Sequence, residues 1–99
     1  PALANIAPND PMTTTILIYD IPHDGLRAKV ADACLDYGLA RVQYSAFLGR
    51  LNHNRQQEIL QRLRRLVGQK PARIQLVPVC EKDLRLMKEV ITAGYTVDR

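Results

Sequence analysis

The sequence predicts a single α+β domain in which an antiparallel sheet is covered on one face by two helices. Its 99 residues are enough for one small domain and too few for a second core. Apolar residues make up 46% of the chain and charged residues 24%, which is an ordinary globular composition and argues against intrinsic disorder. Hydrophobic residues also recur with strand-type and helix-type periods, in the order β-α-β-β-α-β.

Residues 1–11 stand apart from this pattern. The stretch PALANIAPNDP contains three prolines and two asparagines without a hydrophobic period, and Met12 follows it. It also lacks the basic start and apolar block of a signal peptide. We therefore expect residues 1–11 to be an expression tag or a disordered segment, and residues 12–99 to form the domain.

The first strand and helix have clear boundaries. Thr13–Ile21 is rich in β-branched and aromatic residues and is apolar on both faces, which is typical of a central strand. Pro22 ends this strand. Asp24 is then predicted to cap a helix that runs to Tyr37, and Gly38 ends it because glycine readily adopts a left-handed conformation.

The middle of the chain predicts a second strand region and a second helix. Ala40–Leu51 alternates with period two, which indicates two short strands or one bent ribbon, with Gly49 as a bend or bulge. Asn52 or Asn54 is expected to cap a helix that ends at Val67.

The pattern of residues in the last third of the chain predicts one more strand of the core fold. Ala72–Cys80 has a strand pattern, and Pro78 favours an edge strand or a strand end over the centre of a ladder, because proline cannot donate to a ladder. From Glu81 the pattern is mixed, and we expect a polar turn or short helix followed by an extra strand over Glu89–Ala93.

Charge, cysteines and hydropathy narrow the class of protein. Lys and Arg number 14 against 10 acidic residues, and the resulting charge of +4 favours an anionic partner. Cys34 and Cys80 lie far apart, which argues against a disulfide framework and for a reducing, cytoplasmic location. No apolar run approaches the roughly 18 residues that cross a bilayer, so we expect no membrane partner.

The β-α-β-β-α-β order is that of the ferredoxin-like fold, whose two helices cover one face of the sheet. The first strand is apolar on both faces, so the other face also needs a cover. A domain of this size buries only about 60–65% of its unfolded surface by itself. We therefore expect a homodimer through the sheet face.

Several motifs at fixed distances resemble one known family. They are Tyr19-Asp20, Arg27 with Lys29, Tyr37-Gly38, and RVQYSAFLG from Arg41 to Gly49. The resemblance is to the small CRISPR-associated endoribonuclease family, the ferredoxin-like second protein of the CRISPR adaptation module. It extends from about Thr14 to Ile91.

The resemblance implies a site and a set of partners. Asp20 and its dimer mate would hold a divalent metal, Mg²⁺ or Mn²⁺, shared between the two subunits for phosphodiester hydrolysis, with Tyr19 as the second catalytic residue. Arg27, Arg41 and Phe47 would lie around this site and contact nucleic acid. The tail strand, within residues 88–99, would be exchanged across the dimer, and the dimer would bridge the CRISPR integrase subunits on duplex DNA.

The residues themselves leave plainer interpretations open. A strand-end aspartate such as Asp20 often only hydrogen-bonds the next turn. Arg27 and Arg41 can bind phosphate bidentately, but without the resemblance the residues alone favour ordinary solvated surface charges. Phe47 fits dimer packing better than base stacking.

Arginines also recur at helical spacing in the second predicted helix, at Arg55, Arg62 and Arg65. Such a stripe is usually a solvated face, and Arg62 and Arg65 are alternatively contacts to a DNA backbone.

Three functions therefore stay open. The first is a metal-dependent endonuclease that cleaves RNA or DNA. The second is a non-catalytic DNA-binding scaffold for the integrase, and the third is a toxin-type mRNA interferase of the same fold. The resemblance favours the adaptation nuclease.

Overall fold

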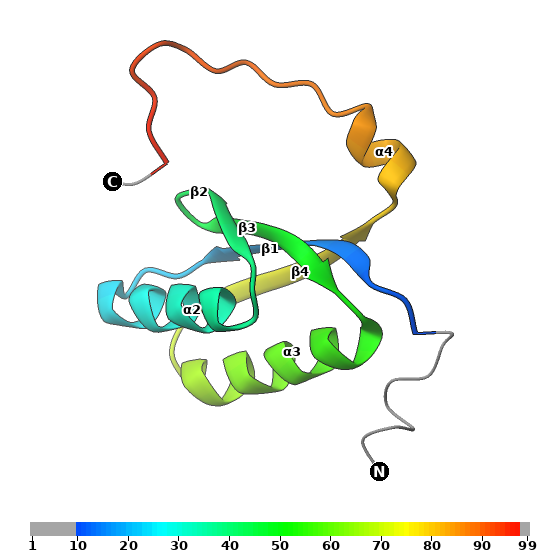
Figure 1. The fold of residues 1–99 in the computed structure, drawn as a ribbon. Coiled ribbons are helices and arrows are strands. Elements are labelled where there is room, and N and C mark those ends of the chain that lie inside the picture. Colours follow the sequence, from blue (N-terminus) through cyan, green and yellow to red (C-terminus); the bar gives the residue numbers. More distant parts are fainter. Residues whose placement is uncertain (1–9, 98–99) are drawn as a thin grey trace.

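The computed structural model of the protein describes residues 10–97. The expectation for residues 1–11 therefore falls mostly outside the described residues, as does the end of the tail. The described part contains a four-stranded sheet of order β2-β3-β1-β4 in which all neighbouring strands are antiparallel. Two long helices lie against one face of this sheet (Figure 1). The predicted α+β, ferredoxin-like fold is confirmed.

The elements follow the predicted order. They are β1 (Thr13–Asp20), α2 (Asp24–Asp36), β2 (Ala40–Gln43), β3 (Ala46–Leu51), α3 (His53–Val67), β4 (Arg73–Val79) and α4 (Glu81–Arg85). The region Ala40–Leu51 is thus two short strands, and β4 with Pro78 is an edge strand, as predicted. Among residues 10–97, no helix is both long and apolar enough to cross a membrane.

Side chains cap both long helices. The Nδ1 atom of His23 accepts a hydrogen bond from the Leu26 backbone N–H at 3.0 Å, so His23 is the cap of α2 and the prediction of Asp24 is wrong. Asp24 is instead the first helical residue, where a carboxylate also favours the positive end of the helix dipole. Asn52 caps α3, because its Oδ1 accepts from the Arg55 backbone N–H at 2.8 Å.

The core lies between the sheet and the two helices. Leu17 of β1 and Phe47 of β3 are partners in the strand register, and both have no exposed surface. Val30 of α2 and Ile59 and Leu63 of α3 are buried with them. The expectation that Phe47 packs against a dimer partner is therefore wrong, because its ring is enclosed within its own subunit and offers no exposed surface to a base.

Gly49 permits a close approach rather than the expected bend. A Cβ atom at this position would lie only 2.6 Å from Cδ2 and 3.1 Å from Cα of Leu39. Glycine thus lets the segment before β2 pack directly on β3. The irregularity in this hairpin lies instead between Arg41 and Gln43 of β2.

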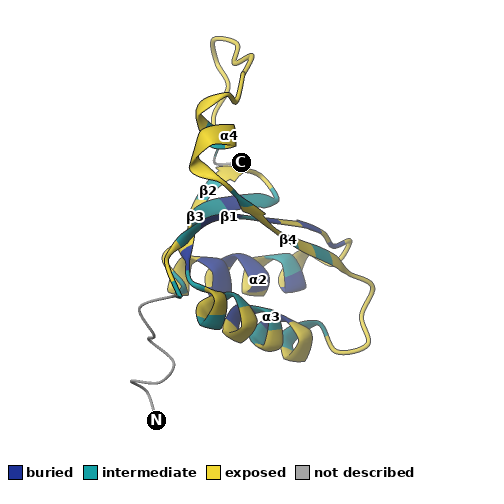
Figure 2. Cartoon of the chain, turned by 90° about the vertical axis from the view of Figure 1, so that its right-hand side faces the viewer, coloured by how far each residue is buried: buried dark blue, intermediate teal, exposed yellow. Residues whose placement is uncertain are grey.

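The opposite face of the sheet is apolar but largely open in the single chain. Ile16 of β1 lies between Leu48 of β3 and Val77 of β4, and Ile18 follows two residues later. Ile18 is 36% exposed and Val77 is 42% exposed. Figure 2 shows both long helices on the other side of the sheet. We refer to this surface as the open face.

The chain leaves the sheet after β4. Residues 86–97 extend from α4 and arc back on the open-face side toward the β2–β3 turn (Figure 1). Their exposed apolar side chains are Leu86, Met87, Val90, Ile91 and Tyr95. The short helix predicted after Glu81 is confirmed, whereas Glu89–Ala93 is irregular chain in the described residues because no strand pairs with it. Its exchange across a dimer stays a prediction.

Candidate functional site

Asp20 is exposed at the end of β1, on the open face. Successive side chains of a strand point to opposite faces, so the neighbouring Tyr19 points toward the helices. Tyr19 is accordingly only 7% exposed. The two predicted catalytic residues are thus adjacent in sequence but lie on different faces of the sheet, and Asp20 is the accessible one.

A cavity of about 180 Å³ lies beside Asp20. It is lined by Ile18, Tyr19, Asp20, Arg73 and Gln75. Arg73, at the start of β4, is the direct partner of Asp20 in the β1–β4 register, so its side chain leaves the sheet on the same face. Sequence analysis missed Arg73 as a site residue, because the register between two distant strands cannot be read from either strand alone.

Tyr19 belongs to a cluster on the helix side of the sheet. Its ring stacks on Phe47 with centroids 6.2 Å apart, and the Arg41 guanidinium lies 5.2 Å from the Phe47 centroid. Burial raises the pKa of the Tyr19 phenol, while hydrogen bonding and the positive charge of Arg41 offset part of this rise. Within residues 10–97, the buried Nε of Arg41 has no hydrogen-bond partner. Arg41 is thus placed with Tyr19 and not with Asp20.

Cys34 of α2 faces the same cluster and is fully buried. Burial raises the pKa of its thiol to about 12, although the charge of Arg41 acts in the opposite direction. The thiol therefore stays protonated at neutral pH, which is the state of an unreactive structural cysteine.

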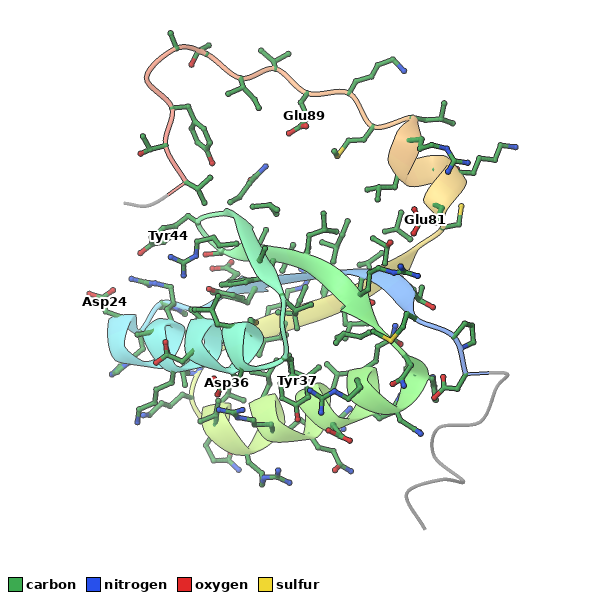
Figure 3. All side chains as sticks on the ribbon, in the orientation of Figure 1. Asp24, Asp36, Tyr37, Tyr44, Glu81 and Glu89 are labelled. Carbon is green, nitrogen blue, oxygen red and sulfur yellow. The ribbon has the colours of Figure 1, made fainter. Side chains whose placement is uncertain are left out.

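Arg27 is bonded to the turn that follows Asp20. Its Nη1 donates to the carbonyl oxygens of Ile21 at 2.7 Å and Pro22 at 3.0 Å, and its Nη2 pairs with the carboxylate of Asp24. The guanidinium also lies 5.8 Å from the ring centroid of Tyr44. Figure 3 shows Asp24 at the start of α2 and Tyr44 at the β2–β3 turn. Arg27 therefore stabilises the turn beside the candidate site.

The predicted arginine stripe lies on α3, away from Asp20. Arg62 pairs with Asp36 of α2 at 2.8 Å, and Arg55 lies 4.3 Å from the ring centroid of Tyr37. Figure 3 shows Asp36 and Tyr37 where the two helices meet. Arg65 is exposed, and its side chain has no ion pair with a residue between 10 and 97. In this stripe the charge of Arg62 is therefore neutralised by Asp36, whereas that of Arg65 faces solvent.

One subunit supplies few ligands for a metal. Within residues 10–97, no group of three or more His, Cys, Asp or Glu side chains is placed to hold an ion. Mg²⁺ in proteins usually keeps several waters and uses one or two carboxylates together with substrate phosphates. The single carboxylate of Asp20 could serve such an ion as one of its ligands.

Comparisons with known proteins identify the family. A family model described as "CRISPR associated protein Cas2" matches residues 12–87. The chain belongs to the Cas2 family. The predicted family is thereby confirmed. The "CRISPR-associated endoribonuclease Cas2" of Desulforudis audaxviator is 51% identical over 81 residues, which are 81% of this chain and 76% of the relative.

Other relatives support the assignment to Cas2. "CRISPR-associated endoribonuclease Cas2 2" of Chloroflexus aurantiacus is 51% identical over 61 residues, covering 62% of this chain and 72% of the relative. A "CRISPR-associated endonuclease Cas1/endonuclease Cas2 fusion" of Thermoproteus tenax is 50% identical over 52 residues, covering 52% of this chain and 20% of the fusion. The crystal structure of hypothetical protein TT1823 from Thermus thermophilus matches with a TM-score of 0.70 at 29% identity, over 87% of this chain and 98% of that one.

Proposed function

We propose that this Cas2-family protein is a metal-dependent endoribonuclease of CRISPR adaptation that acts as a homodimer. The observation that carries the proposal is the place of Asp20, an accessible carboxylate at the end of the uncovered apolar face. A second copy on that face would supply the second carboxylate. The names of the relatives at 51% identity support the same activity.

A second copy is the occupant that the open face suits best. Ile16, Ile18 and Val77 form an apolar surface at the centre of the sheet, and the apolar tail leaves on the same side. A twofold pair buries the same patch on both subunits. It would also give residues 88–97 a strand edge with which to pair, in keeping with the predicted exchange of the tail.

Two Asp20 carboxylates in such a dimer would hold one Mg²⁺ or Mn²⁺ ion. The bound ion would polarise the phosphodiester and help to activate an attacking water. Tyr19 would stay protonated at neutral pH, because burial raises its pKa. It would support the end of β1 from the helix side, together with Arg41 and Phe47.

A second candidate function is a scaffold that binds duplex DNA and bridges integrase subunits. The Thermoproteus relative favours it, because that protein carries Cas1 and Cas2 segments in one chain. Arg62 and Arg65 are the proposed backbone contacts for this function. The family match favours both candidates over a toxin-type mRNA interferase. A cytoplasmic location stays a prediction.

A metal titration of cleavage tests the proposed activity. The unmodified dimer should cleave RNA or DNA only with Mg²⁺ or Mn²⁺, and a chelator should stop it. Asp20→Asn should abolish cleavage, whereas Asp32→Asn on the exposed surface of α2 should retain it. Cleavage that survives both Asp20→Asn and chelation would disprove the assigned site. Absence of cleavage with intact DNA binding would favour the scaffold.

A further inference from the structure

We propose that Arg73 binds the scissile phosphate beside Asp20 and is a catalytic residue of the site. The inference rests on the proposed nuclease function and deepens it. It arises from the β1–β4 register, which places a guanidinium and a carboxylate opposite each other on the open face.

The position of Arg73 is set by the backbone of two paired strands. Directly opposed residues in an antiparallel pair have Cβ atoms only about 4.5–5.5 Å apart. Asp20 and Arg73 are such a pair at the end of the sheet, and both are exposed. They line the same cavity of about 180 Å³, with Gln75 beside them. A phosphate that approached Asp20 would therefore meet Arg73.

The Arg73 guanidinium is available to a ligand. Its side chain makes no hydrogen bond or ion pair with any residue between 10 and 97, although Asp20 lies opposite. Arg27 differs, because its donors are used by the turn and by Asp24. Arg41 lies at Phe47 on the other face of the sheet. Arg73 is thus the arginine that shares both the face and the cavity of Asp20.

A cation beside Asp20 suits the chemistry of the site, in addition to the proposed metal ion. A phosphodiester is anionic, and Asp20 is a carboxylate, so the two groups repel unless positive charge lies between or beside them. Guanidinium matches two phosphate oxygens with two parallel N–H donors. During hydrolysis a water oxygen bonds to phosphorus and gives up a proton, the bond to the leaving oxygen breaks, and that oxygen takes up a proton. Negative charge grows on the non-bridging oxygens, where the donors of Arg73 would stabilise it.

Arg50 offers a matched control. It is exposed and lies opposite Thr14 in the register, so it shares the open face with Arg73. Thr14 is six residues before Asp20, which is about 20 Å along a strand. A change at Arg50 removes the same charge from the same face without touching the cavity.

Cleavage of a fluorescent single-stranded RNA by excess full-length protein, with saturating Mg²⁺ or Mn²⁺, tests the inference. Arg73→Gln should lower the single-turnover rate by about 100-fold or more, as the loss of one transition-state donor commonly does. Arg73→Lys should recover part of this loss, and guanidinium chloride at low millimolar concentration should partly rescue Arg73→Ala. Arg50→Gln should stay within about threefold of the unmodified protein, the loss expected of a phosphate-distant surface charge. Thermal unfolding and sedimentation of each variant exclude a folding defect.

The outcomes separate this inference from the proposed function. If Asp20→Asn abolishes cleavage while Arg73→Gln cleaves at nearly the normal rate, the inference is wrong and the nuclease assignment stands. If the unmodified protein does not cleave, the nuclease assignment fails, and binding of the same RNA with Ca²⁺ decides the role of Arg73. A larger loss of affinity for Arg73→Gln than for Arg50→Gln then supports a phosphate contact, and equal affinities overturn it.

Discussion

The two faces of the sheet are built from alternate residues of the same strands, yet only one face is covered by the helices. On the helix side, Leu17 and Phe47 have no exposed surface. On the open face, Ile18 is 36% exposed and Val77 is 42% exposed. The first face can stabilise the single chain, whereas the second gains its burial only when another molecule covers it.

This difference divides the residues that the family resemblance groups together. Tyr19, Arg41 and Phe47 lie on the covered face and contact one another. Asp20 and Arg73 lie on the open face at the same end of the sheet. We infer that the first group supports the end of β1, while the second meets the substrate.

The largest expected effect comes from the covered face. Phe47→Ala should lower the free energy of unfolding by about 3–5 kcal/mol, because it removes a large buried ring and leaves a cavity. Urea denaturation measures this loss. Val77→Ala, on the open face, should cost clearly less under conditions where the protein is a monomer. Equal losses for the two variants would contradict the difference between the faces.

The order of elements was predictable from sequence because hydrophobic period and helix-ending residues are local properties. The predicted start of α3 after Asn52 and its end at Val67 agree with the structure for this reason. The cap of α2 was not predictable, because His23 and Asp24 are adjacent and either can accept the hydrogen bond. Backbone conformation decides between them, and His23 is in the extended conformation that a cap adopts.

A smaller effect is expected when the open face is disrupted. Val77→Asp should weaken the proposed dimer by about 2–3 kcal/mol, since it buries an unpaired charge, or forces it to protonate, when the faces meet. Sedimentation across micromolar concentrations should show a shift from about twice the 11.2 kDa chain mass toward the monomer.

Leu35→Asp is the matched control for this dimer experiment. Leu35 is an exposed apolar residue of α2, on the helix side of the molecule. Its replacement should leave the association unchanged. A dimer that Leu35→Asp disrupts and Val77→Asp leaves intact would mean that the helix layer is the interface.

The candidate site was only partly predictable. Asp20 was identifiable because a carboxylate directly follows an apolar strand. Period two also predicted that Arg41 and Phe47 share a face, which the register confirms, but it could not tell which face the helices cover. Arg73 lies 53 positions after Asp20 in the sequence, and only the folded sheet brings the two residues together.

Alkaline pH should lower the free energy of unfolding through a residue of the covered face. The Cys34 thiol has an ordinary pKa of 9.0, which burial raises to about 12. As the pH rises, the thiol of the unfolded chain therefore loses its proton before that of the folded chain does. The free energy of unfolding is accordingly unaffected by this group below pH 9, and it falls as the pH rises from 9 toward 12. Each pH unit in this window costs up to about 1.4 kcal/mol.

Urea midpoints at pH 8 and pH 10.5 measure the alkaline loss. Cys34→Ala should lose less stability between the two pH values than the unmodified protein does. Cys80→Ala, at an exposed position, should behave like the unmodified protein. Identical losses for all three proteins would show that Cys34 is not the group that titrates.

The smallest expected effect concerns the outer surface of the helix layer, where DNA would bind if it does not lie on the open face. Arg65→Gln should lower the slope of log affinity against log salt for duplex DNA by about one unit for each phosphate that this arginine neutralises. It should do so equally for all sequences, because phosphate contacts carry no sequence information. Arg62→Gln should change the slope less, because Arg62 already pairs with Asp36. If only Arg73→Gln lowers the slope, the duplex contacts the end of the sheet at Asp20 and Arg73, and the stripe on α3 is a solvated surface.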